Sequence, residues 1–349
     1  MAALVAVLSI HGRAAGPDVR GWLDRYGRGQ FDGVTAEFTS VKDYEAFYQA
    51  FTKQAPDWIA AGAPADRPRR ELAAATFALE AARANELRDW KYVQSWMGLE
   101  NIYWRSAAKF VEWGCALLRQ RPTSSPIERV WQLASIAVAD RAVDYEFLVG
   151  SPWDGRANPK DEILHLEHAA KRFPGERRFA LNQGIAAEWR LFPLRRTGQA
   201  EAQKIFETLK DDPEVGAEDT VRLGVMAFRA NNVTAALPLF QSADARTREP
   251  YVVYLARYFA GQSHERLRQQ AAAEHAYRGA LAATPRAQSA SFALSALLGG
   301  QGRRTEAAAV IDAALTASPL AFDPWRAYGE ADARFWPVLI AQLHAEIAK

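Results

Sequence analysis

The sequence predicts an all-α protein built as a stack of antiparallel helix pairs, an α-solenoid, and three observations support this fold class. Segments such as 69–88 and 271–282 are rich in Ala, Leu, Glu and Arg, and their apolar residues recur every three or four positions, as in amphipathic helices. Runs that alternate strictly between apolar and polar residues, as half-buried strands do, are missing. Stretches rich in Gly, Pro, Asn and Asp, such as 62–68 and 299–304, separate the helical segments and mark turns.

Composition limits the classes of function before any motif is considered. The 349 residues are 49% hydrophobic and 24% charged, which is ordinary for globular proteins and allows two or three domains or one long array of repeats. Lys and Arg number 43 against 41 Asp and Glu, and the charges are interspersed along the chain. Since nucleic-acid-binding proteins usually carry a basic stripe or tail, we expect no nucleic-acid partner.

Residues 1–14 carry the one targeting signal that we identify. The uncharged run AALVAVLSI at 2–10 precedes small residues around Arg13, as in the last part of a secretory signal peptide. We therefore expect export to a bacterial periplasm or cell envelope, with a gene start placed too late. No basic region precedes the run, so the alternative is an apolar terminus of a cytoplasmic protein. The run is shorter than the roughly 20 residues of a membrane span, and no integral membrane segment is expected.

Residues 15–150 are predicted to form an N-terminal helical region with weak repeats. The stretch WLDRYGRGQFDGVTAEF at 22–38 has the turn and the aromatic spacing of one repeat unit. Residues 40–150 are helical in composition, but their repeat phase cannot be assigned. The longest loop, at 151–160, is the best candidate for a boundary between this region and the next, although it could also join two parts of one solenoid.

Residues 161–319 contain a repeated pattern. The interval from Pro285 to Pro319 is 34 residues, and the interval from Pro250 to Pro285 is 35. Ala, an aromatic or branched residue, Ala and Pro recur at identical offsets before the last two of these prolines. These residues are Ala273, Tyr277, Ala280 and Pro285 in one unit, and Ala307, Ile311, Ala314 and Pro319 in the next. A third unit, with Leu223, Gly224, Ala236, Phe240 and Ala243, matches as well.

This pattern resembles the tetratricopeptide repeat family, whose period is about 34 residues. That family places large, small and aromatic residues on the first helix of each pair, and small, aromatic, small and proline residues on the second. The small residue on the first helix is Gly224 in one unit and is replaced by Ala256 and Ser295 in the next two. The resemblance is good over 215–319 and fainter over 161–213. It implies a right-handed superhelix in which small residues let the two helices of a pair approach closely.

Residues 320–349 are predicted to form a C-terminal capping helix. Asp323 before Pro324 indicates a helix start, with proline in the first turn. Apolar residues then recur every four positions and are expected to cover the last repeat, as the exposed end of an array requires. These residues are Phe335, Leu339, Leu343 and Ile347. The alternative is a helix that docks a partner through Trp325 and Trp336.

Few residues suggest catalysis or metal binding. His165 and His168 lie three positions apart and share one face of a helix, so a metal site there, with Glu162 or Glu167 as a further ligand, is the alternative to two surface histidines. Cys115, the only cysteine, has apolar neighbours and is expected to be buried and unreactive. Because no nucleophile elbow, phosphate loop or zinc-protease signature occurs, we expect no catalytic residue, no metal and no cofactor.

The predicted function is a non-catalytic scaffold or adaptor that binds a polypeptide in the concave groove lined by the first helix of each pair. Arg229 and Arg257 are expected to pair with carboxylates of the bound chain, or alternatively with acids on adjacent helices. The other hypothesis is a helical enzyme or metal carrier with a site in residues 40–150 or at His165 and His168. The groove residues predicted are Asn182, Arg190, Val225, Phe228, Arg229, Val253, Arg257 and Phe292.

Overall fold

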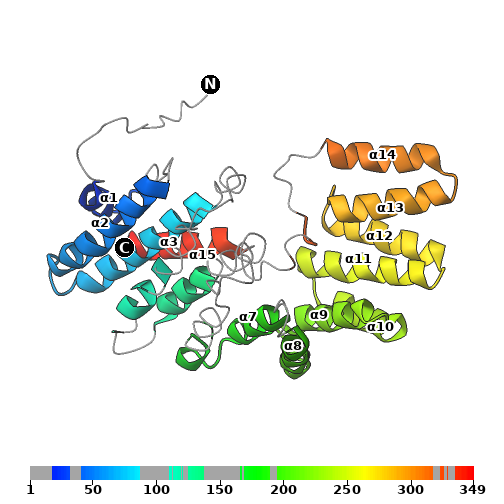
Figure 1. Cartoon of the computed structure of the whole chain (residues 1–349), viewed down its shortest axis with the longest axis horizontal. Coiled ribbons are helices and arrows are strands. Elements are labelled where there is room, and N and C mark those ends of the chain that lie inside the picture. The colour runs from blue at the N-terminus through cyan, green and yellow to red at the C-terminus, as the bar shows by residue number, and fades with distance from the viewer. Residues whose placement is uncertain are drawn as a thin grey trace. The chain divides into compact units, whose positions relative to one another are not determined.

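The computed structural model confirms the all-α fold class, since its described residues form helices joined by turns and bends, with no strand among them (Figure 1). They group into two units, one of residues 1–173 with 332–349 and one of residues 174–331. We call these the N-terminal unit and the repeat unit. The structure describes residues 18–31, 41–86, 110–111, 113–118, 120, 125–136, 166, 169–188, 195–316, 323–325, 328 and 335–349.

Three of the regions expected from the sequence fall outside these residues. They are the apolar run at 2–10, the histidine pair at 165 and 168, and the loop at 151–160. The division between the units lies between Phe173 and Pro174. The repeat unit, as we use the term, therefore begins at residue 174, within the region 161–319 predicted to carry the repeats.

The N-terminal unit is built around an aromatic core. Helices α1 (Val19–Tyr26), α2 (Val41–Ala60) and α3 (Arg67–Glu86) pack on one another, and Asp18 caps α1 by accepting a hydrogen bond from the Gly21 backbone at 2.9 Å. Their buried side chains include Phe47, Phe51 and Phe77, whose rings contact one another. Phe110 belongs to a further short helical stretch and adds its ring to this cluster.

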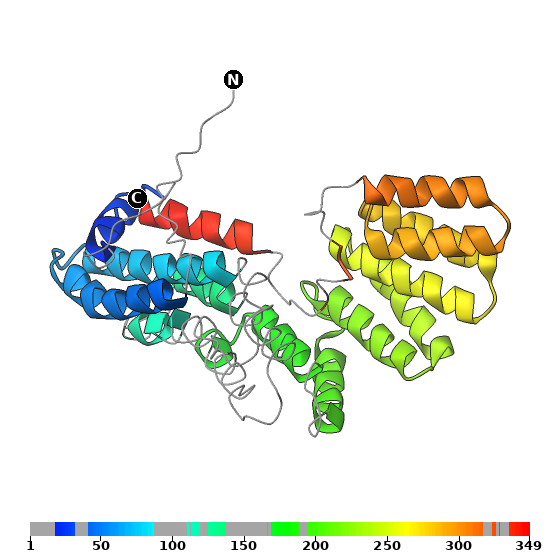
Figure 2. The same ribbon diagram turned by 45° about the horizontal axis from the view of Figure 1, so that its top comes forward.

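The C-terminal helix α15 (Trp336–Ile347) packs on α3 of the N-terminal unit, so its expected position over the last repeat is corrected. Figures 1 and 2 both draw it beside α3. Its apolar face is the predicted one, because Leu339, Leu343 and Ile347 are buried. A periodic apolar face requires a hydrophobic partner but does not specify which one. The helix start expected at Asp323 is also corrected, because α15 begins at Trp336 with proline in its first turn.

In the repeat unit, consecutive helices pack as pairs and the pairs stack on one another. This is the tetratricopeptide-like arrangement predicted from the sequence. Figures 1 and 2 show the stack from α9 to α14. The helices are α7 (Arg177–Glu188), α8 (Arg195–Leu209), α9 (Gly216–Arg229), α10 (Val233–Arg246), α11 (Pro250–Arg266), α12 (Gln270–Ala283), α13 (Gln288–Gly300) and α14 (Arg304–Leu315).

Close approach within each pair occurs where a glycine faces an aromatic ring. A side chain at Gly224 would lie 2.5 Å from the Phe240 ring, and one at Gly261 would lie 2.5 Å from the Tyr277 ring. In the last pair, Ser295 takes the glycine position and its hydroxyl donates a hydrogen bond to the Ala307 carbonyl at 2.9 Å. The small residue of the α11 unit is thus Gly261, and its assignment to Ala256 is corrected. The first helix of that unit is longer than the repeat pattern indicates.

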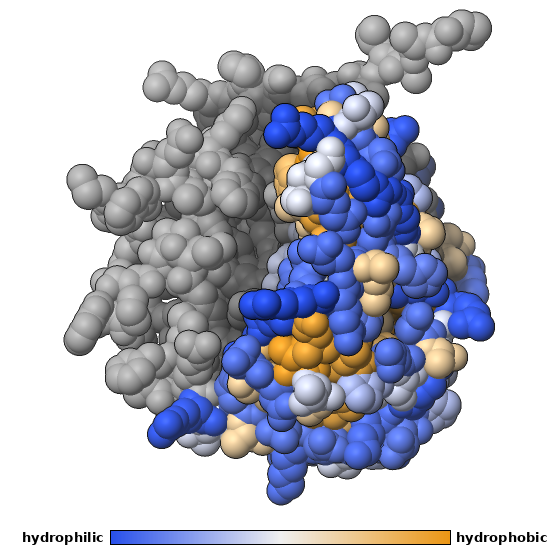
Figure 3. All heavy atoms as spheres, turned by 90° about the vertical axis from the view of Figure 1, so that its right-hand side faces the viewer, coloured by the Kyte–Doolittle hydropathy of each residue, from blue (hydrophilic) through white to orange (hydrophobic). Residues whose placement is uncertain are grey.

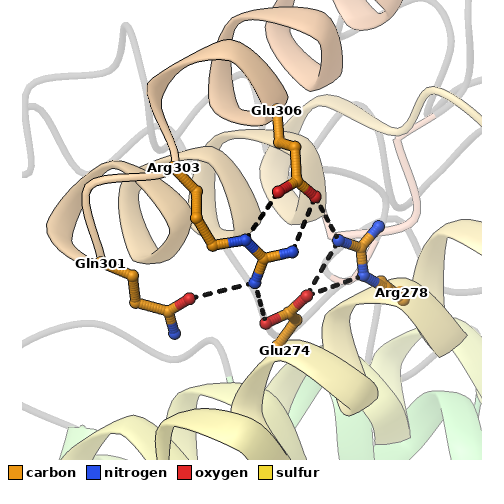
Figure 4. Close-up of polar contacts among 5 residues, drawn as sticks. All are labelled: Glu274, Arg278, Gln301, Arg303 and Glu306. Carbon is orange, nitrogen blue, oxygen red and sulfur yellow. Dashed lines mark hydrogen bonds and ion pairs between the residues drawn. The ribbon is translucent and has the colours of Figure 1, made fainter.

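An ion-pair network ties the last pair to α12 (Figure 4). The Arg303 guanidinium contacts Glu274 of α12 at 2.6 Å and Glu306 of α14 at 2.7 Å. Arg278 also pairs with Glu274, at 2.9 Å. These arginines lower the pKa of both glutamates. The charges are half exposed and mutually neutralised, so the network acts in packing and its contribution is screened by salt.

Candidate functional site

A short segment of the chain, described at residues 323–325 and 328, lies against the first helices of the repeat unit. It includes Asp323, Trp325 and Tyr328, and Figures 1 and 2 draw its short orange-red ribbon beside α11. We call this the self-docked segment and the surface beneath it the docking face. The docking face consists of Glu188 of α7, Arg222 and Arg229 of α9, Tyr254, Tyr258 and Phe259 of α11, and the first turn of α13.

The carboxylate of Asp323 caps helix α13. Its Oδ2 accepts a hydrogen bond from the Ser289 backbone at 2.7 Å, and the Tyr254 hydroxyl accepts one from the Ala290 backbone at 3.1 Å. Ala287, the residue at the cap position, supplies no side-chain hydrogen bond. The first N–H groups of a helix need acceptors, and a negative charge there is favoured by the helix dipole. A carboxylate distant in sequence therefore completes a helix end that its own cap residue leaves open.

The indole of Trp325 packs on an aromatic wall. Its ring meets Phe259 edge-to-face with centroids 4.8 Å apart and lies 6.3 Å from Tyr258. The guanidinium of Arg229 is 5.7 Å from the indole centroid. Edge-to-face pairs and a cation over a ring stabilise such contacts beyond the area they bury.

The side chain of Tyr328 is clamped between charges. Its hydroxyl donates to the Glu188 carboxylate, with oxygen–oxygen distances of 2.9 and 3.1 Å. The Arg222 guanidinium lies 4.4 Å from the Tyr328 ring centroid and donates to the Tyr328 carbonyl at 3.1 Å. Arg222 also pairs with Glu218 at 2.8 Å and with Glu188 at 3.3 Å. The buried cation is therefore paired, as burial of charge requires.

Protonation states follow from this environment. Burial, and then the Glu188 carboxylate, raise the pKa of the Tyr328 phenol well above its ordinary value. Burial also raises the pKa of Tyr258, to about 12, with Asp323 as the next cause. Burial by itself lowers the pKa of Arg222, but Glu218 and the other neighbours outweigh it and the pKa is raised. Near neutral pH the phenols are therefore hydrogen-bond donors and Arg222 is a cation.

Of the predicted groove residues, Arg229 lies on the docking face. It pairs with Glu188 of α7 at 2.9 Å. This corresponds to the second partner considered in the sequence analysis, an acid on another helix of the same chain. Phe228 is buried beside this face, where its ring contacts Phe259 and carries the Arg266 guanidinium 3.6 Å from its centroid. Val225 and Asn182 are buried. Arg190 lies outside the described residues.

Val253 and Arg257 lie on a different side of α11. They line an open hollow of about 450 Å³ with Ala282 and Ala283 of α12, and Arg257 pairs with Asp244 of α10 at 2.9 Å. Their position differs from the predicted one because the small residue of this unit is Gly261 and not Ala256. A shift of five residues corresponds to a rotation of about 140° around the helix axis. Phe292 on α13 is 49% exposed and is one of few large apolar side chains exposed in the described part of the chain. Figure 3 shows the face of the repeat unit on the right-hand side of Figure 1, which is mainly hydrophilic with apolar patches between polar side chains.

The residues that sequence reasoning missed are Glu188, Arg222, Tyr254 and Tyr258, together with the self-docked segment. One signal could have found one of the helix residues. Phe240 and Tyr277 each follow their glycine by 16 residues, and phasing the units on that spacing moves the position predicted at Val253 to Tyr258. No comparable signal exists for the segment, because Asp323-Pro324 reads equally well as a helix start.

The described residues give no support to a metal centre. Among them no group of three or more His, Cys, Asp and Glu side chains is placed to hold an ion. Cys115 is buried, as predicted, 3.5 Å from the Gln132 side-chain oxygen. None of the helices that the structure describes has the length and hydrophobicity of a transmembrane span.

Comparisons with known proteins add little to this description. No family model matches the chain, and no curated protein matches it. Among solved structures, a chain from the crystal structure of the APC/C hetero-tetramer Cut9–Hcn1 is similar, with 14% sequence identity and a TM-score of 0.40. The alignment covers 90% of this chain and 73% of that one. The fold assignment therefore depends on the helix-pair packing described above and not on this similarity.

Proposed function

We propose that the protein is a non-catalytic scaffold that binds a polypeptide on the docking face. The observation that carries this proposal is the self-docked segment, since the face already holds a piece of polypeptide through a carboxylate, an indole and a phenol. Stacked helix pairs commonly bind peptides on the wall formed by their first helices. Paired charges and aromatic rings in the same patch are typical of protein interfaces, where Tyr, Trp and Arg are enriched.

Peptide selection tests the proposal directly. The full chain is immobilised and a random peptide library displayed on phage is selected against it. Selected peptides are then titrated against wild type, Arg229→Ala and Arg257→Ala. The two arginines are matched controls, because each is 37% exposed and each has a guanidinium nitrogen 2.9 Å from a carboxylate oxygen, but only Arg229 lies on the docking face.

Selected peptides are expected to lose about tenfold in affinity to Arg229→Ala and to bind Arg257→Ala like wild type, since a charged contact in a partly buried site is worth about 1.4 kcal/mol or more. Equal binding to both variants would place the binding site elsewhere. Failure to select any peptide, both with wild type and with a full chain carrying Trp325→Ala/Tyr328→Ala, would contradict the proposed function.

A further inference from the structure

We propose that the partner of the docking face is a polypeptide that carries an acidic residue, a Trp two positions later and a Tyr three positions after that, and that the self-docked segment competes with it. This inference rests on the proposed function and names its ligand chemistry. The spacing is that of Asp323, Trp325 and Tyr328. Each of the three side chains meets a chemically distinct part of the face, and the Arg229 guanidinium lies near both aromatic rings.

The acidic position is specified by two groups. The Ser289 backbone N–H donates to one carboxylate oxygen of Asp323 at 2.7 Å, and the Tyr254 hydroxyl lies 3.5 Å from the other. An amide or apolar side chain would not place a negative charge at this helix end. An acidic residue in the partner is therefore favoured over an amide or apolar one.

The two aromatic positions differ in what they demand. The Trp site is a wall of rings, with Phe259 at 4.8 Å, and requires a large flat side chain. The Tyr site ends in the Glu188 carboxylate, which accepts the phenol hydroxyl at 2.9 Å. A Phe there would leave a buried acceptor with one bond fewer, so the site distinguishes Tyr from Phe.

The face retains its own charge pairing when the segment is absent. Arg222 pairs with Glu218 and Glu188, and Arg229 pairs with Glu188, all within α7 and α9. The Tyr254 hydroxyl and the Ala290 backbone N–H are also bonded independently of the segment. A vacated face would therefore stay organised to receive another chain of the same chemistry, with little reorganisation on binding.

Competition by the chain's own segment lowers the apparent affinity for a partner, because only the fraction of molecules with a vacant face can bind it. The test uses a fluorescent peptide with the sequence of residues 319–331, PLAFDPWRAYGEA, titrated against full-length protein. The variant Trp325→Ala/Tyr328→Ala removes both aromatic anchors of the segment and leaves the face intact. Adding Arg229→Ala to it weakens the face, and adding Arg257→Ala is the matched control.

The double variant is expected to bind the peptide at least tenfold more tightly than wild type does. Arg229→Ala should reduce this affinity about tenfold and Arg257→Ala should leave it unchanged. Peptides with Asp replaced by Asn, with Tyr replaced by Phe, or with both aromatics replaced by Ala should bind more weakly, the last of them most. Equal binding of the native and the doubly Ala-substituted peptide would overturn the proposal.

Three further outcomes are decisive. If the double variant does not fold by itself, either the native or the doubly Ala-substituted peptide is added during refolding. Recovery of the helical circular dichroism signal with the native peptide, and not with the substituted one, supports the proposal. If neither peptide restores the signal, the proposal is overturned. If library peptides bind in an Arg229-dependent way but this peptide does not bind the folded double variant, the ligand chemistry is wrong while polypeptide binding stands. If neither binds, both proposals fail.

Discussion

In the repeat unit each helix packs against the helices next to it in the sequence. In the N-terminal unit, by contrast, the C-terminal helix α15 packs on helices from the first quarter of the sequence. Helices α9 to α14 pack on their neighbours in order. In the N-terminal unit, His344 of α15 contacts Glu80 of α3 at 2.9 Å, 264 residues away, and Tyr26 of α1 is within 3.0 Å of the same imidazole. Local packing repeats and so leaves a period in the sequence. A single long-range contact leaves none.

Both units bury charge. The repeat unit buries Arg222, Glu188 and Asp219, and the first two are satisfied partly by the self-docked segment. The N-terminal unit buries Glu128, which pairs with Arg172. A buried carboxylate is paired with an arginine in each unit, as burial of charge requires.

The largest expected effect separates the two units. Arg222→Leu leaves Glu188 and Glu218 buried without their shared cation, and we expect unfolding of the repeat unit to become about 4 kcal/mol easier. Hydrogen–deuterium exchange should rise in α7–α11 and stay unchanged in α1–α3. Arg229→Leu, a half-exposed cation on the same helix, should cost less than about 1 kcal/mol. Equal loss of protection in both units would show that they do not unfold separately.

The next effect tests the contact between the chain ends. Leu343 is fully buried on α15, and Leu343→Ala should destabilise the N-terminal unit by about 3 kcal/mol through lost packing and a cavity. Val338→Ala, at a position on the same helix that is 58% exposed, is the control and should be near neutral. Exchange should increase in α3 and α15 but not in α13 and α14. Increased exchange in α14 would instead indicate that α15 packs over the last repeat.

A third effect depends on pH and belongs to the repeat unit. Burial, and then the Glu218 charge, raise the pKa of Asp219 to about 8, against about 3.9 in an unfolded chain. The folded state therefore binds the proton more tightly, and this contribution to stability is full below pH 4 and is lost as pH rises toward 8. Asp219→Asn should be more stable than wild type at pH 8, with the difference vanishing near pH 4.

Chemical denaturation at several pH values measures this difference, and the exposed Asp312→Asn on α14 is its control. A gain that is the same at pH 4 and pH 8 would contradict the assignment of the effect to the Asp219 proton.

The smallest effect sharpens the description of the repeat. Gly261→Ala puts a methyl group 2.5 Å from the buried Tyr277 ring and should cost about 1–2 kcal/mol through overpacking. Gly299→Ala, where no atom lies within 4 Å, should instead stabilise α13 by up to about 1 kcal/mol because alanine favours helix. Thermal unfolding of both variants measures the contrast. A stabilising Gly261→Ala would mean that the pair approaches less closely than the packing indicates.

Sequence reasoning predicted much of the repeat unit but little of the docking face. Ala273, Tyr277 and Ala280 were identified by their spacing, and all are buried, because the residues that form a helix pair lie close together in the sequence. The prediction placed Arg229 on the face correctly. It placed Arg257 there wrongly, because the longer helix α11 shifts the repeat phase by five residues. Tyr258 was missed for the same reason.

The sequence alone determined the helices, their pairing and the small residues between them, since propensity and periodicity act over one repeat length. It also determined the apolar face of α15. Only the tertiary structure decided what that face covers, and that Asp323 caps α13 while Tyr328 meets Glu188, 140 residues earlier in the chain. The physical reason is that hydrophobic burial and charge pairing are satisfied by any partner of the right chemistry, and only the complete fold selects which partner is brought within reach.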